Sequence, residues 1–85
     1  MTSSQKIREK QKKYIFDAVK NYYKEPIVVS EAKGSIVKDL DGKSYLDFFG
    51  GILTVSIGHA NEEVNSAVKA QISNLTHISS LYPSI

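Results

Sequence analysis

The sequence predicts a small α+β structure, with an N-terminal helix, a small antiparallel β-meander and a second helix. Three observations support this prediction. Apolar residues recur at helical spacing over residues 4–24, an Asp-Gly pair at 41–42 separates two runs with strand character, and a second helical face covers residues 64–75. A chain of 85 residues without cysteine is at most one small domain, and neither disulfides nor thiolate metal sites can reinforce its core.

The first predicted helix covers residues 4–24. The residues that recur at helical spacing are Ile7, Gln11, Tyr14, Ala18 and Tyr22, with Ile15 and Val19 beside them. Ser3 or Ser4 is expected to cap this helix, because a side-chain oxygen there can accept a hydrogen bond from a free backbone N–H. Pro26 is expected to end it, because the residue before a proline is pushed out of the helical region. The apolar stripe then needs another surface to dock on.

Residues 27–48 are predicted to form antiparallel strands. Residues 27–29 are a short β-branched run, and residues 35–40 and 43–48 flank Asp41-Gly42. This dipeptide is the strongest short-range hairpin signal and favours a type I′ turn, with positive φ at both central residues. Lys33-Gly34 is expected to form the preceding turn. Such a meander of two or three strands rarely stands without a covering element.

Glycines punctuate the next segment, which leads into the second helix. Gly50 and Gly51 remove side chains where a backbone must turn sharply or approach something closely, and Gly58 follows the apolar run 52–57. Asn61 is expected to be the N-cap of the second helix, whose apolar face continues to Leu75. The tail from 76 to 85 shows no periodicity.

The charge is uneven along the chain. Residues 1–25 carry seven Lys or Arg against three acids, whereas the whole chain has a net charge of +2. A non-enzymatic binding module that contacts an anionic partner through this basic helix is therefore an alternative function. A solvated helix face is the simpler interpretation, so we expect neither a nucleic-acid nor a membrane partner. With no spanning segment and no signal-peptide layout, a cytoplasmic location is expected, and a mitochondrial one stays open.

Residue types that carry chemistry are present but not grouped. His59 and His77 have no cysteine or acidic cluster at ligand spacing, so no metal site is predicted. No local framework groups a Ser-His-Asp triad, and the glycines do not form a phosphate-binding fingerprint. Asp39 and Asp41 flank a turn and are interpreted as turn residues. Composition and periodicity alone reach no function.

Residues 26–82 nevertheless carry an ordered set of motif positions. Gly34 is followed by DLDGKSYLDFFGGI over residues 39–52, and then by Val55, Gly58-His59, Val64, Ala67, Gln71, Leu75, His77 and Tyr82. This pattern resembles the N-terminal part of class III (subgroup II) pyridoxal-phosphate-dependent aminotransferases. Residues 48–59 look most like the alanine–glyoxylate aminotransferase branch. One departure is Asn61-Glu62, because the family commonly has His-Pro soon after the Gly-His pair.

The resemblance implies a fold-type I enzyme whose large α/β domain lies outside this chain. Residues 1–25 would form a basic amphipathic N-terminal arm helix. Residues 26–85 would form the N-terminal part of the small α+β domain and the start of the linker to the missing domain that binds pyridoxal 5'-phosphate (PLP). Members of the family are homodimers with active sites at the subunit interface, which would give the exposed helical stripe its partner.

The implied activity is amino transfer from an amino acid to a 2-oxo acid, with alanine as candidate donor and glyoxylate or pyruvate as candidate acceptor. PLP would be bound by the full-length enzyme, because the Schiff-base lysine, the acid facing the pyridine nitrogen and the phosphate-binding turn all lie downstream in the family. No catalytic, cofactor-binding or metal-binding residue is therefore assigned here, and the 85-residue chain is expected to be inactive alone. By position in the motif, Ile52, Leu81 and Tyr82 are the predicted substrate-binding residues.

Overall fold

The computed structural model describes residues 2–85 and confirms the predicted α+β composition. In chain order its elements are α1 (Ser3–Tyr14), β1 (Val29–Lys33), β2 (Ile36–Asp39), β3 (Ser44–Leu46), α2 (Gly50–Leu53) and α3 (Glu62–Asn74). The three strands form one antiparallel meander in the order β1-β2-β3. No described helix is long and apolar enough to cross a membrane.

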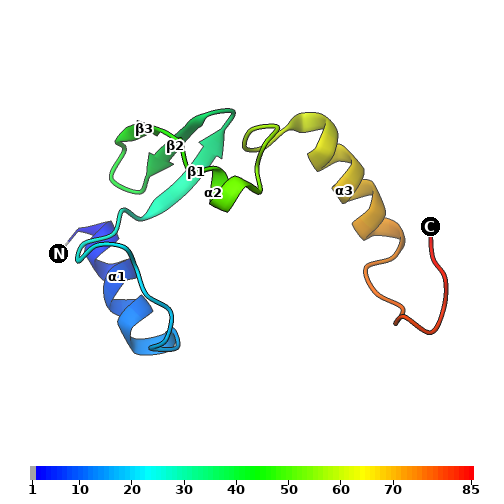
Figure 1. Cartoon of the computed structure of the whole chain (residues 1–85), viewed down its shortest axis with the longest axis horizontal. Helices are drawn as coiled ribbons and strands as arrows, with labels where there is room; N and C mark the ends of the chain where they lie inside the picture. The colour runs from blue at the N-terminus through cyan, green and yellow to red at the C-terminus, as the bar shows by residue number, and fades with distance from the viewer. Residues whose placement is uncertain (1) are drawn as a thin grey trace.

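The elements are strung out rather than packed around a centre. Figure 1 shows α1 at one end, the sheet and α2 in the middle, and α3 with the C-terminal tail at the other end. The radius of gyration is 16.8 Å and the extents are 47 × 29 × 22 Å. A compact chain of this length would have a radius of gyration of about 12 Å. Among the helices and strands of residues 2–85, only neighbouring strands of the sheet have close backbone contacts with each other.

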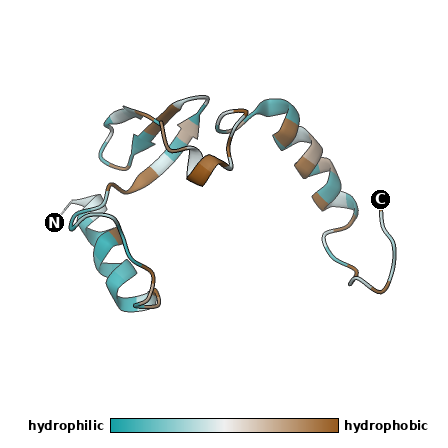
Figure 2. Cartoon of the chain, in the orientation of Figure 1, coloured by the Kyte–Doolittle hydropathy of each residue, from teal (hydrophilic) through white to brown (hydrophobic). Residues whose placement is uncertain are grey.

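No hydrophobic side chain is buried among residues 2–85; the buried residues there are Ser4 and Asp39. Figure 2 shows hydrophobic residues along the sheet, α2 and α3, and the large ones among them are exposed. Large aromatic side chains are among the most exposed, including Phe48 at 94% and Tyr22 at 88%. Exposed apolar surface on this scale indicates faces that another part of the protein or another chain covers.

Helix α1 is shorter than predicted, and its cap is a different residue. Thr2 is the N-cap and forms a capping box with Gln5, so the prediction of Ser3 or Ser4 was wrong by one or two positions. The helix ends at Tyr14 rather than near residue 24. The segment after it is rich in aromatic, β-branched and Asp or Asn residues, which have low helix propensity. It folds back instead, and the side-chain amides of Gln11 and Asn21 face each other at 3.3 Å.

The β2–β3 hairpin forms where predicted, but its turn is not type I′. Gly42 has φ of +94°, whereas Asp41 does not have positive φ. The Asp39 carboxylate is the physical reason, because its Oδ1 accepts hydrogen bonds from the N–H groups of Asp41 (3.0 Å) and Lys43 (2.8 Å). This local bonding stabilises a longer loop with one glycine in the left-handed region. Interpreting Asp39 as a turn residue was therefore right.

The first strand is displaced from its predicted place. It covers Val29–Lys33 instead of 27–29, and its register with β2 shifts between Val29 and Glu31. Glu31 lies opposite Lys38, and their side chains form an ion pair of 3.1 Å across the strands. Because neither side chain is apolar, this extension could not be predicted from a β-branched run.

Helix α3 begins as predicted. The side chain of Asn61 accepts a hydrogen bond from the Val64 N–H at 3.1 Å, and Glu62 and Glu63 occupy the first turn, where the helix dipole favours negative charge. The helix ends at Asn74, and its apolar face is exposed to solvent in this chain.

Candidate functional site

The most unusual backbone in the described chain is the short helical turn α2. Its four residues have positive φ, at +60° for Gly50 and Gly51, +61° for Ile52 and +62° for Leu53. Together they form one turn of left-handed helix between the sheet and α3. Of the two predicted reasons for the glycine pair, a sharp turn or a close approach of the backbone, the positive φ values support the first.

Two of these four residues are strained. Glycine adopts positive φ readily, but a residue with a Cβ in a left-handed helix costs about 1–2 kcal/mol. Ile52 is β-branched, and for such residues positive φ is a genuine outlier. Strain of this kind persists only where the surroundings hold it, and it concentrates at ligand-binding and active sites. The outlier therefore marks the turn as a candidate site.

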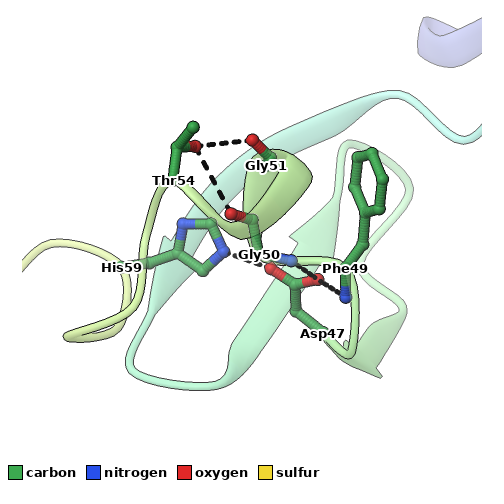
Figure 3. Close-up of polar contacts among 6 residues, drawn as sticks. All are labelled: Asp47, Phe49, Gly50, Gly51, Thr54 and His59. Carbon is green, nitrogen blue, oxygen red and sulfur yellow. Dashed lines mark hydrogen bonds and ion pairs between the residues drawn. The ribbon is translucent and has the colours of Figure 1, made fainter.

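The carboxylate of Asp47 holds the start of the turn. Its Oδ1 accepts hydrogen bonds from the N–H groups of Phe49 (2.8 Å) and Gly50 (2.9 Å), as Figure 3 shows. The backbone N–H of Asp47 donates to the Ser35 carbonyl at 2.8 Å, which ties the residue to the β1–β2 turn. Hydrogen bonds from the Gly50 N–H, from His59 and from the Phe49 N–H lower the pKa of the Asp47 carboxyl to about 2.

His59 occupies the other oxygen of this carboxylate. Its Nε2 lies 2.5 Å from the Asp47 Oδ2, and Figure 3 shows the ring beside the turn. The His59 backbone pairs with Gly34 in both directions, each hydrogen bond being 2.9 Å. The sequence indicates no metal site at His59 and predicts no other role for its ring. The structure instead makes it the link between the turn and the sheet.

Thr54 closes the turn from its C-terminal side. Its hydroxyl donates to the Gly51 carbonyl at 2.5 Å, and its N–H donates to the Gly50 carbonyl at 2.9 Å. The Val55 N–H also donates to the Gly50 carbonyl, at 3.0 Å. The left-handed turn is thus bonded at both ends by side chains outside it.

A second carboxylate, that of the buried residue Asp39, has a different role. Its Oδ2 accepts a hydrogen bond from the Tyr45 hydroxyl at 2.8 Å, in addition to the two backbone bonds of the hairpin. The bond from the Lys43 N–H, together with those from Tyr45 and Asp41, holds the pKa of the Asp39 carboxyl below its usual value. Because all its partners lie in the hairpin, Asp39 stabilises the loop and offers no free oxygen to a substrate.

The three predicted substrate-binding residues lie in two places. Ile52 is in the strained turn and is 70% exposed, whereas Leu81 and Tyr82 are exposed in the tail after α3. The turn and the tail lie at opposite ends of α3, which is about 20 Å long at 1.5 Å per residue (Figure 1). The chain alone therefore does not bring Ile52 together with the other two.

The Asp47 and His59 side chains border a broad apolar hollow. This open concave surface has a volume of about 1000 Å³ and is lined by aromatic and aliphatic side chains such as Tyr22, Phe49 and Leu46. Tyr22 and Phe49 meet edge to face there, with ring centroids 6.3 Å apart. The hollow links the segment after α1 to the sheet, and its open side can take a covering surface of apolar character.

The described residues do not fit a covalently anchored cofactor. None of the lysines is buried, and Lys33 is engaged with the Ala60 carbonyl and Glu62. The carboxylates of Asp39 and Asp47 are occupied by hydrogen bonds within the chain. Among residues 2–85 no three His, Cys, Asp or Glu side chains gather as metal ligands. The segment can shape a site, but it supplies no anchor for a cofactor.

Comparisons with known proteins all point to one family. The family model described as class-III aminotransferase matches residues 18–84. The acetylornithine aminotransferase of Methanosarcina acetivorans is 40% identical over 74 residues, which are 87% of this chain and 18% of that protein. The crystal structure of the acetylornithine aminotransferase from Elizabethkingia anophelis has a TM-score of 0.86 at 27% identity, over 100% of this chain and 21% of that one. Ornithine δ-aminotransferase of Plasmodium falciparum has a TM-score of 0.84 at 29% identity, over 98% and 21%. The chain spans about a fifth of the length of these relatives.

Proposed function

Because the chain belongs to the class III aminotransferase family, we propose that it is the N-terminal segment of a PLP-dependent enzyme that moves an amino group from an amino acid to a 2-oxo acid. The observation that supports this function best is the strained left-handed turn, which presents Ile52 at the position where the family motif places a substrate contact. PLP would be held by residues outside this chain, since the described residues supply no anchor for it.

In this proposal the segment shapes the donor pocket. Ile52 offers an exposed apolar side chain from a backbone fixed by Asp47 and Thr54, and Leu81 and Tyr82 form a second contact once the remaining domains are in place. A rigid apolar contact can orient the aliphatic part of an amino acid for reaction.

Two amino donors are candidates. The motif over residues 48–59 resembles the alanine–glyoxylate branch, which favours alanine with glyoxylate or pyruvate as acceptor. The names of the relatives instead favour N-acetylornithine, since the proteins about 40% identical to this chain are acetylornithine aminotransferases. The names of the relatives carry more weight as evidence for the donor. Each name comes with an alignment over most of this chain, whereas the motif covers only twelve positions.

The exposed apolar surface supports a homodimer of the full-length protein. Residues 1–25 would act as an arm, and residues 26–85 as the first part of the small domain. The hollow lined by Tyr22, Phe49 and Leu46 lies between these two parts and would be covered by the large domain or by the second subunit. A cytoplasmic location stays a prediction from the sequence.

The test is the visible absorption spectrum of the full-length protein purified from its source. A yellow protein whose absorption band shifts on adding N-acetylornithine, and shifts less with alanine at the same concentration, supports the function and the first donor. The reverse order would favour alanine. A colourless protein that added PLP leaves unchanged would contradict the proposed function.

A further inference from the structure

Asp47 and His59 form a chain of contacts from the sheet to the strained turn. The His59 backbone is paired with Gly34, its ring is bonded to the Asp47 Oδ2, and the Asp47 Oδ1 accepts from the N–H groups that enter the turn. The Asp47–His59 contact joins residues 12 positions apart and the Gly34–His59 pair is also distant in sequence, whereas Phe49 and Gly50 directly follow the Asp47 segment. One imidazole and one carboxylate therefore connect the sheet to the start of the turn at residues 50–53, and Thr54 bonds its other end.

The turn needs this support because its own residues do not favour it. Ile52 and Leu53 have φ of +61° and +62°, where residues with a Cβ are strained. Without the fixed carboxylate, the N–H groups of Phe49 and Gly50 lose their acceptor, and the two strained residues are free to return to negative φ. Ile52 would then move relative to the sheet.

We propose that His59 is a positioning residue for the donor pocket: by its hydrogen bond to Asp47 it holds the left-handed turn and so fixes the place of Ile52 against the substrate. This inference rests on the proposed function, in which Ile52 contacts the amino donor. His59 touches neither the donor nor the reacting atoms in this view, since its ring faces Asp47 (Figure 3).

The test compares two variants of the full-length protein. His59→Leu removes the donor to Asp47, whereas His59→Gln keeps a side-chain N–H of similar reach. We expect kcat/KM for the amino donor to fall about 10-fold to 100-fold in His59→Leu, because a small misplacement of a pocket contact costs that much. His59→Gln should recover most of the loss. Equal impairment of both variants, or no impairment of either, would overturn the proposal.

A second readout does not depend on activity. Amide hydrogen exchange of the full-length protein should become faster in peptides covering residues 48–55 of His59→Leu, and should stay unchanged over α3. Faster exchange without a change in kcat/KM would overturn the positioning role. An inactive wild type would instead contradict the proposed function, and the exchange result would still decide whether His59 holds the turn.

A third variant covers the case in which His59→Leu does not fold. Leu53→Gly removes one strained side chain from the turn, and Leu53 is 83% exposed in this chain. The double variant His59→Leu/Leu53→Gly should then recover folded protein and part of the lost kcat/KM, because a relaxed turn needs less support. If Leu53→Gly recovers neither, strain at the turn is not what His59 opposes, and the proposal is wrong.

Discussion

Gly58 lies so close to Gly34 that a Cβ added to Gly58 would stand 3.2 Å from the Gly34 Cα and 3.4 Å from its carbonyl oxygen. This approach allows the paired hydrogen bonds between Gly34 and His59, which join the segment before α3 to the β1–β2 turn. The family's Gly-His pair thus has a physical basis here: the glycine permits the contact, and the histidine uses it to reach Asp47.

Substitution of Gly58 by alanine should therefore destabilise the full-length protein more than the same change at Gly42. The two glycines have nearly equal φ, +95° and +94°, but a Cβ at Gly42 meets nothing within 4 Å. Both variants carry the cost of positive φ, about 1–3 kcal/mol, and Gly58→Ala adds about 1–3 kcal/mol of steric overlap. Urea unfolding of both variants measures the difference. Equal midpoints would show that the Gly34 contact is not tight.

The two glycines of the left-handed turn provide a second matched pair. Gly50 and Gly51 both have φ of +60°, yet a Cβ at Gly51 would lie 2.7 Å from the Thr54 Oγ1, and one at Gly50 meets nothing within 4 Å. We expect Gly50→Ala to cost about 1–2 kcal/mol of unfolding free energy and Gly51→Ala to cost more.

The control for this pair is Thr54→Ala. Thr54→Ala removes the 2.7 Å contact of the added Cβ in Gly51→Ala and leaves the one with Val55 Cγ2 at 3.3 Å. The double variant should therefore be less destabilised than the sum of Thr54→Ala and Gly51→Ala. A double variant as unstable as the sum of its two single changes would show that Thr54 and position 51 do not interact.

The pH dependence of stability should report the Asp47 carboxylate. Its pKa is lowered from 3.8 to about 2 in the folded chain, so the stabilisation by ionised Asp47 is fully present above pH 3.8 and is lost as the pH falls toward 2. Asp47→Asn removes this charge. In the full-length protein, the difference in urea midpoint between wild type and Asp47→Asn should therefore shrink across that window.

The matched control for the pH series is Asp41→Asn. The Asp41 side chain accepts no hydrogen bond within residues 2–85, because only its backbone N–H is engaged. Its midpoint difference from wild type should not follow the Asp47 pattern. A constant difference for Asp47→Asn between pH 5 and pH 2.5 would contradict the lowered pKa.

The fold was predictable where local chemistry determines it. The Asn61 cap and the Asp41-Gly42 turn place α3 and the β2–β3 hairpin, since both signals act within a few residues. The end of α1 was predicted wrongly, because the helical spacing of Tyr14, Ala18 and Tyr22 continues past the point where the backbone stops being helical. Helical spacing shows only that the apolar residues would share one face if the segment were helical. Residues 15–25 are instead a non-helical segment that folds back on α1.

The site was less accessible from the sequence. The hydrogen bonds from the N–H groups of Phe49 and Gly50 to Asp47 were predictable, since an Asp two residues before a turn commonly accepts a backbone N–H there. Its contact with His59 spans twelve positions and depends on the Gly34–His59 pairing, which no local pattern encodes. The positive φ of Ile52 and Leu53 could not be predicted either, because side chains of both types disfavour it.

The chain of residues 1–85 should not unfold cooperatively when produced alone. It buries no hydrophobic side chain among its described residues, and exposed faces on the sheet and both longer helices have no cover. Since burial of apolar surface is the main favourable term in folding, little remains to offset the loss of chain entropy.

We expect a broad, nearly linear change in far-ultraviolet circular dichroism of the isolated chain with temperature, and amide exchange close to that of an unfolded peptide. The full-length protein is the control and should show a sharp transition. A sharp two-state melt of the isolated monomer would contradict the prediction and would mean that the helices close over the hollow lined by Tyr22 and Phe49 without a partner.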